Sequence, residues 1–191
     1  MQFDGVRPEP GGRAPAPGAL RLVQRFVNSV DLEDGPDDLA DAAGLREWLV
    51  AAELLAPGER VSGADHTRAV ALREAIRDLA GAPGDARATA AVNEAARRAG
   101  LQPTLRGAES RLEPSAGGVD GALGHVVAAL HAAIAEDTWE RLKTCDRDDC
   151  RWAFYDHSKN QSSHWCSTAG CGTREKNRRA YRRRRASRGS G

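Results

Sequence analysis

The sequence lacks the features that mark several common classes of protein. No uncharged apolar run is long enough to span a bilayer, and the Gly- and Pro-rich first residues have no apolar segment of the signal-peptide kind. We therefore expect a cytoplasmic protein with no membrane partner. There is also no P-loop, no dinucleotide-binding glycine pattern, no G-x-S-x-G and no H-E-x-x-H motif. These absences argue against an enzyme.

Lysine is scarce, and the positive charge is unevenly placed. Only three of the 28 basic residues are lysine, in a sequence rich in Arg, Ala and Gly with a single Met. This bias is typical of GC-rich coding, so the number of arginines is weak evidence of function. Residues 1–144 hold 16 basic and 22 acidic residues, whereas residues 145–191 hold 12 and 5. Such asymmetry indicates a basic C-terminal module that meets nucleic acid or another acidic partner.

Before residue 144 the apolar spacing is mainly that of helices. Apolar residues recur three and four apart over 20–30 and predict the first helix. An acidic loop, DLEDGPDD, follows, and Asp41 can cap a second helix that ends at APG. Ser62 and Asp65 predict a capping box ahead of a third helix, and the Ala-rich segment 86–99 favours a fourth.

Two further segments complete this larger domain. The short alternating stretches of QPTLRGAESRLEP around Gly107 favour a hairpin, whose strands two prolines confine to edges or ends. From Val119 helical spacing returns as far as Leu142, and it predicts the longest helix, leading straight to Cys145.

The expected fold class is α+β and mainly α. A helical N-terminal domain with a small β-hairpin precedes a module that holds all four cysteines, in the spacing of a zinc-ribbon-like finger, and a basic helix follows. We expect a flexible start at 1–18, the helical domain at 19–143, the finger with its basic helix at 144–188, and a tail at 189–191.

All four cysteines fall within 27 residues in the pattern C-x4-C-x15-C-x4-C: Cys145, Cys150, Cys166 and Cys171. In a reducing cytoplasm clustered cysteines are more often metal ligands than disulfides, and zinc accepts four thiolates at tetrahedral corners. We predict one structural Zn²⁺ in a closed site, with two disulfides or four unrelated thiols as the alternative. The strand-like segments RWAFYD and SSHWC flank the turn-like HSKNQ and predict a hairpin between the cysteine pairs.

The segment between the cysteine pairs also holds aromatic and histidine side chains. Three aromatic residues are expected to form a small core beside the metal: Trp152, Phe154 and Trp165. His157 and His164 are candidate substitutes for a cysteine ligand, but four cysteines already complete a closed site.

The residues after Cys171 are compatible with a helix over 172–187 that has no apolar stripe. Arginines crowded four apart destabilise a free helix, and a phosphate backbone would relieve their repulsion. Positive charge on several faces favours phosphate contacts over the reading of base edges. The predicted contacts with double-stranded DNA are Thr173, Arg174, Lys176, Arg178, Arg179, Arg182, Arg183 and Arg185. A disordered basic tail that aids solubility is the alternative.

Motifs in both parts of the chain carry a resemblance to one family. The finger contains FYDHSKN at 154–160, WCS at 165–167 and CGTR at 171–174, and the helical domain contains FVNSVD, LREWL and ALREAI. These residues resemble the bacterial CGNR zinc-finger proteins, whose N-terminal helical domain is named ABATE and is associated with stress-induced transcription regulation. In the name-giving motif, Thr173 stands where the family has asparagine. Both side chains can hydrogen-bond backbone or phosphate, so we expect the fold to be kept.

The resemblance implies that the four cysteines bind zinc, that the finger binds DNA, and that the helical domain regulates it through a small-molecule effector or a partner. We accordingly expect a zinc-dependent, DNA-binding transcription regulator, associated with the nucleoid when bound. Many regulators read paired half-sites, which is compatible with a homodimer. The alternative function is a protein- or RNA-interaction module with nonspecific polyanion binding.

Overall fold

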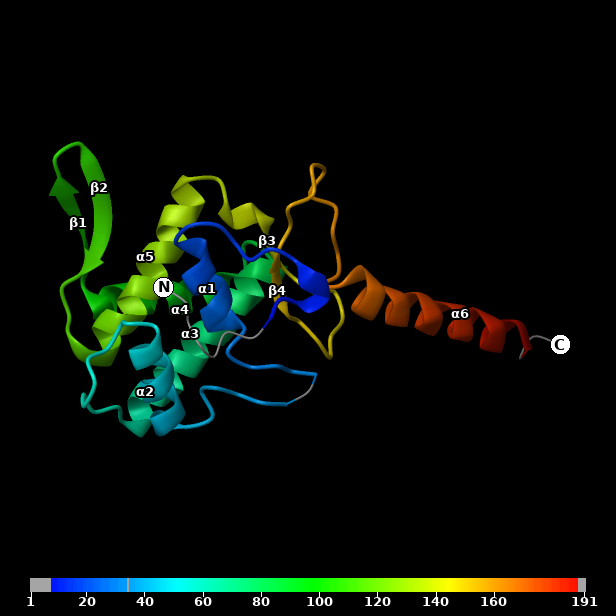
Figure 1. Cartoon of the computed structure of the whole chain (residues 1–191), viewed down its shortest axis with the longest axis horizontal. Helices are drawn as coiled ribbons and strands as arrows, with labels where there is room; N and C mark the ends of the chain where they lie inside the picture. The colour runs from blue at the N-terminus through cyan, green and yellow to red at the C-terminus, as the bar shows by residue number, and fades with distance from the viewer. Residues whose placement is uncertain (1–7, 34, 189–191) are drawn as a thin grey trace.

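A computed structural model describes residues 8–33 and 35–188 (Figure 1). Part of the expected flexible start (1–7) and the expected tail (189–191) lie outside this description. Within the described residues the helices are α1 (Leu20–Val27), α2 (Ala42–Ala51), α3 (Gly63–Gly81), α4 (Ala86–Ala99), α5 (Gly118–Ala135) and α6 (Thr173–Arg188). The strands are β1 (Leu101–Arg106), β2 (Glu109–Pro114), β3 (Leu142–Thr144) and β4 (Ala153–Tyr155). The fold is mainly helical, with two small antiparallel sheets, as the sequence predicts.

The ends of the first helices follow the capping signals in the sequence. Asp41 accepts hydrogen bonds from the backbone N–H groups of Ala43 and Gly44 at the start of α2. At the start of α3, Ser62 and Asp65 form the predicted capping box, in which each side chain accepts from the other residue's backbone N–H. These caps satisfy amides that have no partner inside the helix.

Helix α5 packs against α1, α4 and β2 and supplies much of the main core. Its 18 residues are long and apolar enough to cross a membrane by length and composition alone, but 56% of the helix is buried inside the protein. Its close fit requires glycine at position 124, where a Cβ would lie 2.6 Å from the Cβ of Ala99 and 2.9 Å from that of Pro114. Packing inside the fold therefore accounts for its apolar composition.

Helix α5 is shorter than the sequence predicts. It ends at Ala135, whereas the apolar spacing favoured a helix running to Cys145. Asp137 has a φ of 55°, and the Thr138 hydroxyl donates to the carbonyl of Ala133, which together turn the chain away. A short 3₁₀ turn and strand β3 follow. Leu142 still reaches the core, but from a strand.

The β1–β2 hairpin is present as predicted, paired from Leu101 with Pro114 to Arg106 with Glu109. It lies at the opposite end of the protein from α6, which extends away from the remaining elements (Figure 1). Gly107, with a φ of 66°, occupies the turn between the strands.

The second hairpin differs from the prediction, because β4 pairs with β3 and not with the SSHWC segment. The register runs from Leu142 with Tyr155 to Thr144 with Ala153. Both Ala153 and Tyr155 are buried in the main core, and burial there holds β4 against β3 and the helices. In addition, the side chain of Asn28, the residue directly after α1, both donates to the Ala153 carbonyl and accepts from its N–H, at 2.8 Å each. The β3–β4 hairpin of the finger is therefore built into the core of the helical domain, while the cysteines form a separate buried cluster.

Candidate metal centre and basic helix

The four cysteines converge at one place, although they come from separate segments of the chain. Cys145 follows β3, Cys150 and Cys166 lie in loops, and Cys171 lies in a π-helical turn over Thr168–Gly172. All four are buried, and their Sγ atoms lie within 4.8 Å of one another. The Cys150–Cys166 and Cys166–Cys171 sulfur distances are 3.7 and 3.5 Å. A tetrahedron of Zn–S bonds of about 2.3 Å has edges of about 3.8 Å.

Thiols held this close cannot all ionise without a cation. Hydrogen bonds from Cys150 and Cys166 lower the pKa of Cys145 to about 2. The same contact with Cys145 raises the pKa of Cys150 to about 12, and contacts with Cys145 and Cys150 raise the pKa of Cys166. Repulsion among these crowded sulfurs therefore opposes their joint ionisation, and a divalent metal would offset it. The sulfur donors and their spacing fit one structural zinc ion.

The surroundings of the site agree with a closed structural centre. Trp152 and Phe154 are buried beside the cysteines, with Trp165 packed against them, as the sequence predicts. The two histidines are occupied elsewhere: His157 hydrogen-bonds backbone carbonyls of the N-terminal segment, and His164 pairs with Asp146. Neither is in the ligand cluster, so the four-cysteine set is complete without them.

Arg147, inside the first cysteine loop, is a charged residue of the site that sequence reasoning missed. It forms a two-point ion pair with Asp149 at 2.8 and 2.5 Å, which raises the pKa of the guanidinium above its usual range. Its place among the three aspartates of this loop is the feature of the sequence that could have indicated an ion pair. Arg147 partly neutralises a face that would otherwise be strongly acidic.

The turn that holds Cys171 leads without a break into α6. Ser167 caps it: its side chain accepts from Gly170 N–H, and its carbonyl accepts from Gly172 N–H, both at 3.0 Å. Gly172 fits against Trp165, where a Cβ would lie 3.0 Å from the indole Cδ1. Thr173 donates its hydroxyl to the Thr168 carbonyl at 3.3 Å. The position of the first turn of α6 is therefore set by the cysteine site.

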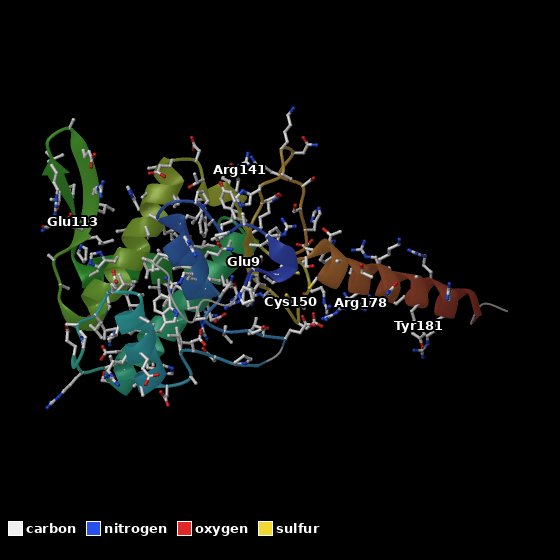
Figure 2. The ribbon with its side chains drawn as sticks, viewed as in Figure 1. Glu9, Glu113, Arg141, Cys150, Arg178 and Tyr181 are labelled. Carbon is white, nitrogen blue, oxygen red and sulfur yellow. The ribbon has the colours of Figure 1, made fainter. Side chains whose placement is uncertain are left out.

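The predicted DNA-contacting residues fall into two groups along α6. Near the finger, Glu175 is buried and pairs with Arg178 at 2.7 Å and Arg179 at 2.8 Å, while Arg174 pairs with Glu33 of the acidic loop. Four basic side chains are exposed and form no ion pair within the part of the chain that is described: Lys176 near the finger, and Arg182, Arg183 and Arg185 farther out. Figure 2 shows the side chains of α6, including Arg178 and Tyr181, projecting from a helix that stands clear of the rest.

A buried arginine joins the finger to the helical domain, and no local pattern in the sequence marks it. The side chain of Arg77, on α3, is fully buried. It donates to the carbonyls of Val27 at 2.6 Å and Arg151 at 3.2 Å, and it pairs with Glu74 at 3.1 Å. Burial lowers its pKa, although Glu74 acts in the opposite direction. One side chain thereby connects α1, α3 and the first cysteine loop.

The fold and the cysteine site define a zinc-finger protein in which the finger is built onto a helical domain. The ABATE family, described as "Putative stress-induced transcription regulator", matches residues 20–144, and the chain belongs to this family. A second family model, the CGNR zinc finger, matches residues 141–185. None of the curated proteins matches the chain.

Proposed function

We propose that the protein regulates transcription by binding double-stranded DNA through α6, with zinc fixing where that helix begins. The observation that supports this most directly is the continuity of the Cys171 turn with α6. A basic helix without an apolar stripe has no core of its own to orient it. Anchored at a metal ligand, it presents its charge to a polyanion in one direction.

The first expected contacts with phosphates are the four exposed basic residues of α6 that form no ion pair among the described residues. Arg174, Arg178 and Arg179 must first give up or share their carboxylate partners. With about four to six phosphates neutralised, the logarithm of the binding constant should fall against the logarithm of salt concentration with a slope of about −4 to −5. Thr173 is already used inside the turn, so its place among the DNA contacts stays a prediction.

The sharpest test is selection of bound duplexes from a random pool, run on the intact protein and on Cys166→Ser, with zinc content measured for both. We expect enrichment of related duplexes by the intact protein and loss of both zinc and binding in the variant. Equal binding by Cys166→Ser would contradict the anchored-helix model. A salt-dependent affinity without any preferred duplex, or a preference for RNA, would favour the interaction module instead.

For the helical domain we propose a sensing role, with no catalytic step. Helices α3, α4 and α5 line a partly open pocket of about 150 Å³. Its walls combine apolar residues such as Ala95 and Leu123 with four charged ones: Arg68, Glu94, Arg98 and Asp120. A cavity of about this size can hold one benzene ring. Ala95→Leu should fill it, and it would remove any effector response without removing DNA binding. We also propose that the protein is a homodimer. Its proposed location is the cytoplasm, in association with the nucleoid when it is bound to DNA.

A further inference from the structure

We propose that the N-terminal segment Glu9–Ala16 is a working part of the zinc finger, and that Arg13 positions the second cysteine loop. This segment lies before the residues matched by either family model. It includes a 3₁₀ turn at Pro10–Gly12, and its last residue, Ala16, is buried in the main core. We call the segment Glu9–Ala16 the strap. The inference depends on the zinc site and not on DNA binding.

Arg13 contacts both the backbone at the second cysteine pair and an aromatic ring beside the metal site. Its Nε donates to the carbonyl of the ligand Cys166 at 2.7 Å, and its Nη2 donates to the carbonyl of Trp165 at 2.9 Å. Its guanidinium also lies over the ring of Phe154, 4.8 Å from the centroid. The planar fork of arginine suits two adjacent carbonyls and an aromatic face at once, whereas a lysine ammonium does not.

The strap also touches the other cysteine segments. The Trp152 indole N–H donates to the Glu9 carboxylate at 3.2 Å, close to the first cysteine loop. Gly11 packs on Ser167, where a Cβ would lie 2.9 Å from Oγ. Ser167 in turn caps the turn that holds Cys171. The strap thus reaches the neighbourhood of both cysteine pairs.

Its far end is fixed to the helical domain. The N–H of Ala16 donates to the side chain of Gln24 on α1 at 2.7 Å. Gln24 is itself buried and donates to the carbonyl of Ala153 in β4 at 3.2 Å. The carbonyl of Ala14 meets the ring of His157 at 3.1 Å. The strap is therefore held at one end by the core and at the other by the cysteine loops.

The second cysteine loop depends on such external support because it is not paired in a sheet. The SSHWC segment forms no strand, and the backbone carbonyls of Trp165 and Cys166 have Arg13 as their hydrogen-bond donor. Opening of this loop exposes two of the four ligands. The strap should accordingly govern how fast zinc leaves and how firmly the first turn of α6 is held.

The test measures the rate at which a chromogenic chelator removes zinc from the full chain, from Arg13→Gln, from Arg13→Lys and from a chain lacking residues 1–16. Loss of two hydrogen bonds from a charged donor should speed release by about tenfold or more. We expect Arg13→Lys to behave like Arg13→Gln, because positive charge alone does not make the paired contact. In the two Arg13 variants, thermal unfolding of the helices, followed by circular dichroism, should change little.

Arg87→Gln is the matched control, since Arg87 is an exposed residue of α4 with no ion pair in the described part of the chain. It should release zinc at the parent rate. The proposal is overturned if Arg13→Gln and the shortened chain both release zinc like the parent. It is equally overturned if release accelerates only in proportion to a fall in the unfolding temperature, because the strap would then be a general packing element.

Discussion

The carboxylate of Glu33, in the acidic loop after α1, forms an ion pair with the guanidinium of Arg174 in the first turn of α6. The same carboxylate lies 3.9 Å from Arg147 in the first cysteine loop. The helical domain therefore places negative charge on the finger and on the base of the basic helix. A DNA phosphate approaching Arg174 has to compete with this residue of the protein itself.

Replacing Glu33 should strengthen DNA binding if α6 is the contact surface. Glu33→Gln keeps the size of the side chain, removes its charge and frees Arg174, so we expect affinity for duplex DNA to rise roughly three- to tenfold at low salt. Fluorescence anisotropy at several salt concentrations measures this. Glu109→Gln removes the same charge from the distant hairpin, where Glu109 is exposed and pairs with Arg111. An equal gain in the two variants would mean that only net charge matters.

Removing zinc should disorder the finger and α6 while leaving α1 to α5 folded. The crowded thiols would lose the cation that holds them, and α6 has no apolar stripe to keep it helical. Circular dichroism should show a loss of helix that returns when zinc is added back. Cys171→Ser should resemble the zinc-free protein from the outset. A helical signal that is unchanged by chelation would show that α6 is stable without the metal site.

Arg77 should be among the most sensitive positions for stability. Arg77→Ala removes a buried cation and leaves the carbonyls of Val27 and Arg151 and the carboxylate of Glu74 without this donor. We expect a loss of about 3–5 kcal/mol in the free energy of unfolding, measured with urea. Arg97→Ala breaks an exposed pair with Glu94 and should cost at most about 0.5 kcal/mol. Similar losses for the two variants would contradict a joining role for Arg77.

Glu9 should make stability depend on pH in a defined direction. Burial raises the pKa of its carboxyl, outweighing the opposing effects of the Trp152 hydrogen bond and of nearby Arg21 and Arg13. A carboxyl whose folded pKa is raised binds its proton more tightly in the folded state. Its ionisation therefore disfavours folding, fully above the folded pKa and not at all below the unfolded value of about 4.3.

Glu9→Gln keeps an acceptor for Trp152 and removes this charge. The variant should gain stability relative to the parent near pH 7, and the difference should shrink as pH falls towards about 4.5. Urea unfolding between these pH values measures it. Glu140→Gln, at an exposed position, should show no such trend. A difference that grows towards acid pH would reverse the assigned direction.

The parts of this protein that sequence predicts well are those that local spacing decides. Caps at Asp41 and Ser62 act within three residues, and the hairpin around Gly107 closes over a few more. The four cysteines were recognisable as one zinc site because metal coordination brings together any four thiols whose connecting loops are long enough. The basic helix and the aromatic core beside the metal follow from the same short segment.

Only the tertiary structure decided which distant groups meet. Apolar spacing extended α5 to Leu142, but burial against the helical core places that residue in a strand paired with β4. Nothing local marks Arg13 or Glu33 as partners of Cys166 and Arg174, which lie more than a hundred residues away. Such contacts depend on tertiary packing, since packing of α1 against β4 and of α3 against β3 sets the distances. The sequence by itself therefore determined the zinc site and the basic helix. The fold determined which distant groups contact them: Arg13 at the second cysteine loop and Glu33 at the base of α6.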